Sequence, residues 1–357
     1  MRQNSRWIIL GLLVLFALST ALPMFSDMGL GCSPDVPSNP SAEAKKPLPD
    51  LDIPNFNSDS AYVFTEKIVG LSPRIVGTEG AMKVKKYVVA QFKKYGAEVI
   101  EQPFSAVTFD GKSHKATNII AQYNKAATNR VVLSCHWDSR PFADRDADEA
   151  DKNKPILAAD DSGSSMGMLI EIARQLQAKP IANLGVDIVF FDAEDYGNPN
   201  PPKPKSLEEQ AAQGKEWGIG AQYWSKIPHM PGYKALYGIN LDMAGAKGAR
   251  FVKESISVRY APQVVEKVWR IAQDKYGYVN IFVNDMSRED MTDDHVFVNE
   301  LAKIPMIDII NHPTDSFFGK YWHTTDDNMS IIDRETLRAV GRTVLATLHY
   351  EAAGSFN

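Results

Sequence analysis

Hydrophobic residues recur at helical spacing in residues 59–69 and again in residues 79–95. The second stretch places five apolar residues on one side of the predicted helix: Met82, Val84, Val88, Val89 and Phe92. This period is typical of an amphipathic helix. The turn at residues 74–80 leads into it. Further helical stretches are predicted at residues 164–177, 262–276, 294–301 and 334–352.

Short runs rich in β-branched and aromatic residues separate these helices. They lie at residues 98–100, 117–123, 131–135, 186–191, 235–241 and 305–310. Several are apolar at every position, which is typical of strands that helices cover on both faces. Strands that alternate with helices predict one mixed, mainly parallel sheet in a three-layer α/β domain. Ligands of such sheets bind beyond the carboxyl ends of the strands.

The N-terminal part of the chain has a different pattern. Arg2 and Arg6 precede an uncharged run at residues 7–25, which indicates a secretory signal that could also span a bilayer if it is not removed. Cys32 lies in a Gly-Leu-Gly-Cys-Ser sequence that resembles a bacterial lipoprotein box, and an uncleaved signal anchor is the alternative. Residues 1–32 are therefore interpreted as a signal, lipoprotein or anchor segment.

Prolines recur at short intervals in residues 33–56, which predicts a semi-rigid linker. Residues 57–357 then form a single catalytic α/β domain. We expect a bacterial envelope protein that is anchored to a membrane and holds its catalytic domain in the periplasm. Whether Cys32 is lipidated does not alter this expectation.

Composition narrows the possible functions. Apolar residues make up 44% of the chain and charged residues 23%, as in ordinary globular proteins. The net charge of −5 gives no basic surface, so nucleic acid is not an expected partner. Cys135 lies in an apolar run and is predicted to be a buried core thiol. The acidic loop at residues 144–149 departs from the EF-hand pattern and is expected to be solvated.

Carboxylates gather where predicted strands end and helices begin. Glu194 and Asp195 follow the strand at residues 186–191, where neighbouring acids repel one another unless a cation compensates. Asp242 follows another apolar strand. Asp160 and Asp161 precede a helix, where one aspartate suffices as the N-cap and the second is available to bind a ligand. A solvated acidic turn and ordinary helix caps are the alternatives.

The choice of metal follows from the types of ligand. His323 is one of seven histidines and follows these carboxylate motifs along the chain. Two aspartates and one histidine leave a fourth position open, which suits a catalytic zinc ion. The set lacks cysteine, which argues against a structural zinc site.

In their order and spacing, these motifs resemble the animal-type glutaminyl cyclases, which share a fold with zinc aminopeptidases. The resemblance runs from about Arg74 to the C-terminus. It rests on residues 135–139, 159–162, 190–195, 242, 293–295 and 322–324. It implies that Asp161, Asp195 and His323 hold one zinc ion per chain and that Glu194 is the general acid and base.

The resemblance also implies roles for residues around these ligands. Asp242 and Asp293 would form a carboxylate network behind Glu194, to which Ser162 and Asp308 belong. The substrate pocket would be walled by Trp322, Phe317, Phe318 and Trp137. Three positions depart from the animal pattern: Asp195 replaces a glutamate, Asp308 a histidine and Met166 a disulfide cysteine.

The implied reaction closes the N-terminal glutamine of peptides and proteins into pyroglutamate and releases ammonia. A two-zinc aminopeptidase is the alternative, with His136 and Asp242 as extra ligands and Asp161 as the bridge. A third possibility is a receptor-like binding protein without catalysis. The cyclase is favoured because Trp322 and Trp137 adjoin histidines, since a tight aromatic pocket limits access of water.

Overall fold

The computed structural model describes residues 46–356, and from Leu48 onward these residues form one compact unit. The uncharged run at residues 7–25 and Cys32 lie outside the described residues. Within residues 46–356, none of the helices has the length and apolar character needed to cross a membrane.

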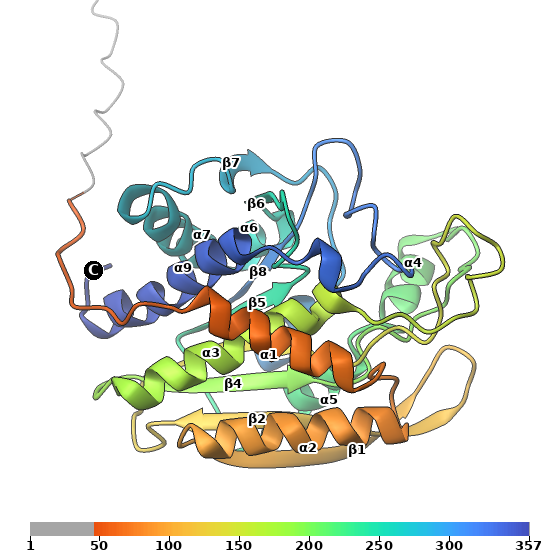
Figure 1. The fold of residues 1–357 in the computed structure, drawn as a ribbon, viewed down its shortest axis with the longest axis horizontal. Coiled ribbons are helices and arrows are strands. Elements are labelled where there is room, and N and C mark those ends of the chain that lie inside the picture. The colour runs from red at the N-terminus through yellow and green to blue at the C-terminus, as the bar shows by residue number, and fades with distance from the viewer. Residues whose placement is uncertain (1–45, 357) are drawn as a thin grey trace, which may run out of the picture. The chain divides into compact units, whose positions relative to one another are not determined.

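A six-stranded sheet forms the centre of the domain (Figure 1). Its strands lie in the order β1 (Glu98–Val107), β2 (Ser113–Tyr123), β4 (Gly185–Phe191), β3 (Arg130–His136), β5 (Tyr237–Asp242) and β8 (Met306–Ile310). Strands β4, β3, β5 and β8 are parallel, whereas β2 runs antiparallel to both β1 and β4. The predicted mixed, mainly parallel sheet is confirmed.

Helices cover both faces of this sheet. Alternate residues of its central strands therefore pack in two different cores. Val131 and Leu133 contact the first core, and Val132 contacts the second. The first core includes residues of α1 (Ser58–Leu71), α2 (Glu79–Lys94), α3 (Ser165–Ala178), α7 (Pro262–Arg270) and α9 (Arg334–Ala352). The second includes residues of α5 (Ile219–Lys226), α8 (Asp294–Phe297) and the helical turn Val298–Ala302.

Other elements adjoin this central arrangement. They are α4 (Leu207–Gly214), α6 (Ser255–Tyr260) and a second, two-stranded sheet of β6 (Phe251–Lys253) and β7 (Phe282–Met286). The buried Phe251 and Phe282 of this second sheet pack in the first core. None of the residues of α4 is buried, so it carries no apolar stripe that the sequence could reveal. Strand β1 continues well past the predicted residues 98–100. It is an edge strand with mostly exposed or half-buried positions, so its sequence lacks the continuous apolar run that predicts a central strand.

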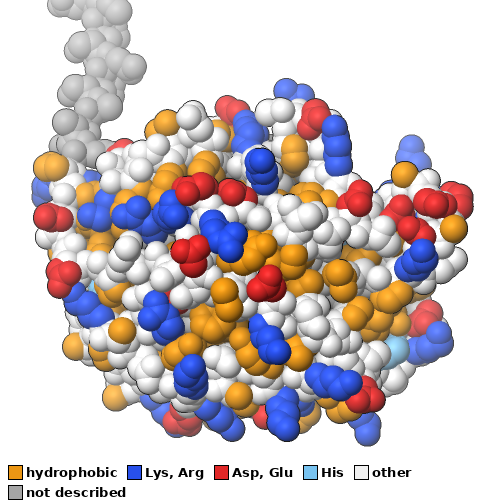
Figure 2. Space-filling view, viewed as in Figure 1, with side chains coloured by type: hydrophobic (Ala, Val, Ile, Leu, Met, Phe, Trp, Pro, Cys, Tyr) orange, Lys and Arg blue, Asp and Glu red, His pale blue; other side chains and the backbone are white. Residues whose placement is uncertain are grey.

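Two expectations from composition can be compared with the structure. Cys135 is fully buried in β3, and burial raises the pKa of its thiol well above the ordinary value, which suits a core residue. On the face that carries α1 and α2, Lys and Arg side chains are interspersed with Asp and Glu (Figure 2).

Candidate active site

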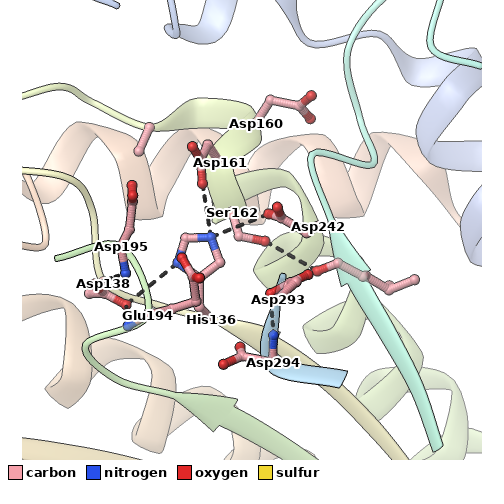
Figure 3. A network of polar contacts seen from close by, with 12 residues as sticks. His136, Asp138, Asp160, Asp161, Ser162, Glu194, Asp195, Asp242, Asp293 and Asp294 are labelled. Carbon is pink, nitrogen blue, oxygen red and sulfur yellow. Dashed lines mark hydrogen bonds and ion pairs between the residues drawn. The ribbon is translucent and has the colours of Figure 1, made fainter. Parts of the chain in front are cut away.

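The predicted site residues meet at the carboxyl ends of the parallel strands. His136 ends β3, Glu194 and Asp195 follow β4, and Asp242 ends β5. Figure 3 shows the side chains of Asp161 and Asp242 pointing toward the ring of His136. Since parallel strands end at one edge of the sheet, residues far apart in sequence converge there.

Asp161, Asp195 and His323 form one possible metal site, with ligand atoms within 4.8 Å of one another. The Nε2 atom of His323 lies 3.1 Å from Oδ1 of Asp195 and 3.7 Å from Oδ2 of Asp161. All three residues are buried. Within the described part of the chain, Oδ2 of Asp161 and Oδ2 of Asp195 are buried without a hydrogen-bond partner. Buried, unpaired carboxylate oxygens are costly unless a cation compensates, so these residues fit a divalent metal.

His136, Asp161 and Asp242 form a second possible metal site. The Nε2 atom of His136 lies 2.9 Å from Oδ1 of Asp161 and 3.2 Å from Oδ1 of Asp242. Asp161 is thus common to both sets and presents a different oxygen to each. The geometry supplies the ligands that either a one-zinc or a two-zinc enzyme would need.

Buried hydrogen bonds hold the turn that carries Asp161. The carboxylate of Asp327 accepts the backbone N–H groups of Asp160 at 2.8 Å and Asp161 at 3.1 Å. The fully buried guanidinium of Arg74 donates to the carbonyls of Ala158 at 2.8 Å and Leu157 at 3.0 Å. These contacts fix the backbone that leads into Asp161.

The two neighbouring aspartates of this turn, Asp160 and Asp161, have different roles. The Oδ1 atom of Asp160 accepts hydrogen bonds from Ser164 Oγ and from the backbone N–H of Gly245, both at 2.7 Å. Burial raises the pKa of Asp160 to about 6. Asp161 instead faces the cavity. One aspartate therefore stabilises the turn and the other is available to bind a ligand.

Asp138 positions the turn that carries Glu194 and Asp195. Its two carboxylate oxygens accept the backbone N–H groups of Glu194 at 3.0 Å and Asp195 at 3.1 Å. Ala193 adopts a left-handed backbone conformation with a φ of 59°. Such conformations are uncommon outside glycine and often occur at functional sites. The turn directs Glu194 into the cavity.

The environment of Glu194 suits proton transfer. Glu194 is 8% exposed, and burial raises the pKa of its carboxyl well above the ordinary value. His136 opposes this shift, while Asp293 and Asp195 add to it. A general acid and base works best when its pKa lies near the working pH, so an upward shift favours that role.

A network of buried carboxyls lies behind Glu194. The Nδ2 atom of Asn240 donates to Asp293 at 2.9 Å and to Asp308 at 3.2 Å. Burial raises the pKa of Asp308 well above the ordinary value, and Asp293 raises it further. Burial also raises the pKa of Asp242, to about 8. Ser162 connects the Asp161 turn to β5 by donating to the carbonyl of Leu241 at 3.3 Å.

A cavity of about 200 Å³ opens onto these groups. Its polar lining is Asp161, Glu194, Asp195, Asp242, Asp290, Thr292, Asp293 and His323, and its aromatic lining is Trp217, Phe317, Phe318 and Trp322. The rings of Trp322 and His323 stack with their centroids 3.8 Å apart. Phe318 lies against Trp322 at 4.8 Å.

Trp137 does not belong to the lining of this cavity. It is 2% exposed, packs in the first core, and donates its indole N–H to the carbonyl of Thr117 at 3.0 Å. His136 and Trp137 are successive residues where β3 ends, and successive side chains of an extended backbone point to opposite sides. The prediction of Trp137 as a pocket residue is corrected on this ground.

The acidic loop at residues 144–149 is only partly solvated. Asp144 accepts a hydrogen bond from the buried guanidinium of Arg140 and lies 3.5 Å from Nδ1 of His323. Asp146 accepts hydrogen bonds from Thr325. The expectation of a solvated loop is therefore wrong for Asp144 and Asp146, while residues 147–149 are exposed.

Sequence reasoning missed four residues that shape the site: Arg74, Asp138, Arg140 and Asp327. Asp138 stands two residues after His136, and Asp327 stands four after His323, so nearness to a candidate ligand was the available signal. Nothing local marks the two arginines as buried.

Comparisons with known proteins agree with this geometry. The model of peptidase family M28 matches residues 118–348. The crystal structure of Tannerella forsythia glutaminyl cyclase is 46% identical, covers 83% of this chain and 99% of that chain, and superposes with a TM-score of 0.77. A Zn-dependent exopeptidase from Parabacteroides distasonis is 43% identical, with 83% and 99% covered and a TM-score of 0.78.

Relatives of lower identity are named glutaminyl-peptide cyclotransferases. The glutaminyl-peptide cyclotransferase of Drosophila melanogaster is 28% identical over 313 residues, which are 80% of this chain and 79% of that protein. The resemblance to the glutaminyl cyclases that the sequence motifs indicate is confirmed. The chain belongs to peptidase family M28 and, within that family, to the group of proteins that includes the glutaminyl cyclases.

Proposed function

We propose that the protein is a zinc-dependent glutaminyl-peptide cyclotransferase. It converts the N-terminal glutamine of peptides and proteins into pyroglutamate and releases ammonia. One observation carries the proposal. Asp161, Asp195 and His323 converge beside Glu194 in a small, aromatic-walled cavity of a chain that is 46% identical to a glutaminyl cyclase.

Asp161, Asp195 and His323 are the residues that would hold the zinc ion. When bound, zinc acts as a Lewis acid that polarises the substrate amide carbonyl. The donor set supports this assignment, because two carboxylates and one imidazole leave a position open for substrate. The relative from Parabacteroides distasonis is itself described as Zn-dependent.

Glu194 would move the single proton that the reaction requires. The α-amine of the substrate, with an unperturbed pKa of about 8, attacks the γ-carbonyl carbon of its own side chain. Glu194 takes a proton from the amine as the new C–N bond forms. It then gives this proton to the departing nitrogen, which leaves as ammonia when the original C–N bond breaks.

The aromatic wall supports cyclisation rather than hydrolysis. Trp322 and Phe318 restrict the cavity to about 200 Å³ and would hold the glutamine side chain folded toward its own amine. An intramolecular attack gains much of its rate from such an arrangement. A narrow apolar wall also limits water, the competing nucleophile.

A two-zinc aminopeptidase is the second candidate, because His136 faces both Asp161 and Asp242. Incubation with peptides that begin with Gln or Leu, followed by mass spectrometry, separates the two activities. Loss of ammonia from the Gln peptide, without release of free amino acid from either peptide, supports the cyclase. Release of free amino acid from either peptide supports the aminopeptidase. Absence of both reactions would leave a receptor-like binding protein, which the complete set of ligands and Glu194 disfavours.

We further propose that residues 1–32 tether the protein to a membrane of the bacterial envelope. Residues 33–56 would serve as the linker, and residues 57–357 as the catalytic domain in the periplasm. The uncharged run before Cys32 supports this location. Labelling with a fatty acid that is lost in Cys32→Ser would identify a lipoprotein, whereas an unlabelled membrane protein would indicate the uncleaved anchor. A wild-type protein in the soluble fraction would refute both forms.

A further inference from the structure

The acidic loop contacts the turn around His323 at three points, although the two segments lie far apart in sequence. The backbone N–H of Arg145 donates to the carbonyl of His323 at 3.1 Å. The carboxylate of Asp146 accepts the backbone N–H of Thr325 at 2.9 Å and its hydroxyl at 2.7 Å. Asp144 faces the imidazole itself, with its Oδ1 atom 3.5 Å from Nδ1 of His323. Asp144, Arg145 and Asp146 are called the acidic clamp below.

His323 needs support of this kind, because its backbone is left-handed with a φ of 56°. Such a conformation is unfavourable for a non-glycine residue and persists only where the surroundings hold it. The contacts of Arg145 and Asp146 to backbone groups at and after His323 provide that support. The acidic clamp therefore compensates for a local backbone strain.

The imidazole of His323 has two distinct sides. Its Nε2 atom faces Asp161 and Asp195, and its Nδ1 atom is buried without a hydrogen bond to any described residue. The Oδ1 atom of Asp144 is the carboxylate oxygen that lies toward Nδ1. An imidazole that directs an Nδ1 proton to a carboxylate keeps the lone pair on Nε2 free for a metal.

Asp144 is itself fixed by Arg140, whose side chain is 1% exposed. The Nε atom of Arg140 donates to Asp144, and its guanidinium also donates to the carbonyl of Asp195 at 3.1 Å. Asp144 is thus paired with a buried guanidinium and held between the segments that carry His323 and Asp195.

We propose that the acidic clamp is a positioning device for the zinc ligand His323. Asp144 orients the imidazole so that Nε2 points into the metal site, and Asp146 fixes the backbone of the turn. This role rests on the proposed function, because it requires that a metal binds at His323. Asp144 and Asp146 belong neither to the cavity lining nor to a possible metal site of the described residues, so they act through His323 and its turn.

The test is the zinc affinity of the full chain, measured by competition with a chromogenic chelator. Asp144→Asn keeps the size of the side chain but removes its charge. It should weaken zinc binding by about 10- to 100-fold, as for other carboxylates that orient a zinc-bound histidine. Asp146→Asn, which weakens the contacts to Thr325, should shift the affinity in the same direction.

Asp148→Asn is the matched control, since Asp148 lies in the same loop, is exposed, and accepts only a local N–H from Ala150. Its zinc affinity should stay within about twofold of wild type, as for most surface substitutions. Positioning also predicts that saturating zinc restores most of the kcat of Asp144→Asn at an unchanged KM. The visible spectrum of the cobalt-substituted variant should differ from that of wild type, which a general loss of stability would not explain.

Three outcomes would overturn the inference, and they are distinguishable. If wild type binds zinc and both Asp144→Asn and Asp146→Asn bind it equally tightly, the acidic clamp has no positioning role, and the proposed function stands. If wild type itself has no affinity for zinc, the proposed function and the clamp fail together. An equal loss in Asp148→Asn would also refute the clamp, because any change in the loop would then weaken the site.

Discussion

Substitution of Glu194 by glutamine tests the chemistry most directly. The cavity is lined by four carboxyls that are not placed among the ligands of the one-zinc site: Glu194, Asp242, Asp290 and Asp293. Asp242 accepts a hydrogen bond from His136 at 3.2 Å, and Asp293 accepts one from Asn240 at 2.9 Å. Both are committed to the network, and Asp290 is paired with Arg259 at 2.9 Å, so none of the three is free to replace Glu194.

The expected loss follows from this lack of a substitute. General acid–base catalysis contributes about 10²- to 10⁴-fold to rates, so Glu194→Gln should lower kcat by about 10³-fold. This corresponds to about 4 kcal/mol of transition-state stabilisation. Zinc content should not change, because Glu194 is not among the three proposed ligands. Glutamine is nearly isosteric and uncharged, and burial already disfavours the charged form of Glu194, so the fold should tolerate it.

The assay measures ammonia released from a Gln peptide together with zinc content per chain. Glu289→Gln is the control, because Glu289 is an exposed glutamate of the loop before Asp293. It should retain wild-type turnover. If Glu194→Gln kept more than about a tenth of the wild-type kcat with full zinc, the loss would fall below the range for general acid–base catalysis and Glu194 would have no part in proton transfer.

Three further predictions address the metal, the pocket and the buried acids. Purified wild type should contain one zinc ion, and His136→Ala should keep it; two tightly bound ions, with one lost in His136→Ala, would favour the aminopeptidase. Trp322→Ala should raise KM for Gln peptides by about tenfold, since its ring stacks in the wall of the cavity, while Trp322→Phe should retain most of the affinity. Burial raises the pKa of Glu254, but the hydrogen bond with His295 and those from the backbone of α6 outweigh it and bring the pKa to about 2, below the ordinary 4.5. Ionised Glu254 therefore stabilises the fold above about pH 4.5, and this stability is lost as the pH falls from 4.5 to 2. In urea unfolding, Glu254→Gln should cost about 3 kcal/mol near pH 7 and much less near pH 2; an equal cost at both would contradict the assignment.

The sequence was most informative where one physical signal dominated. Strands β3 and β4 are buried at every position, so their apolar runs located them well. The carboxylates after β4 and β5 followed from the rule that ligands gather where parallel strands end. The ligand set itself depended on the resemblance, because spacing alone does not show that His323 approaches Asp195.

Other features depended on contacts that no local pattern records. The acidic loop looked solvated because its partners, Arg140 and Thr325, are visible only in the fold. Trp137 and Trp322 both adjoin a histidine, yet only Trp322 lines the cavity. Trp137 follows β3 in extended backbone, which turns it away from His136, whereas the left-handed turn at His323 lets Trp322 stack on its neighbour.

The buried guanidinium of Arg74 has a practical consequence for any shortened version of the protein. The family match begins at residue 118, yet Arg74 lies before it and holds the carbonyls of Leu157 and Ala158. A protein trimmed to the matched region would lose this brace along with α1 and α2. The turn before α3 would then have free carbonyls and a vacant space beneath it. Soluble versions should therefore be cut ahead of Leu48, where the compact unit begins, so that α1 and its N-cap Asn57 are retained.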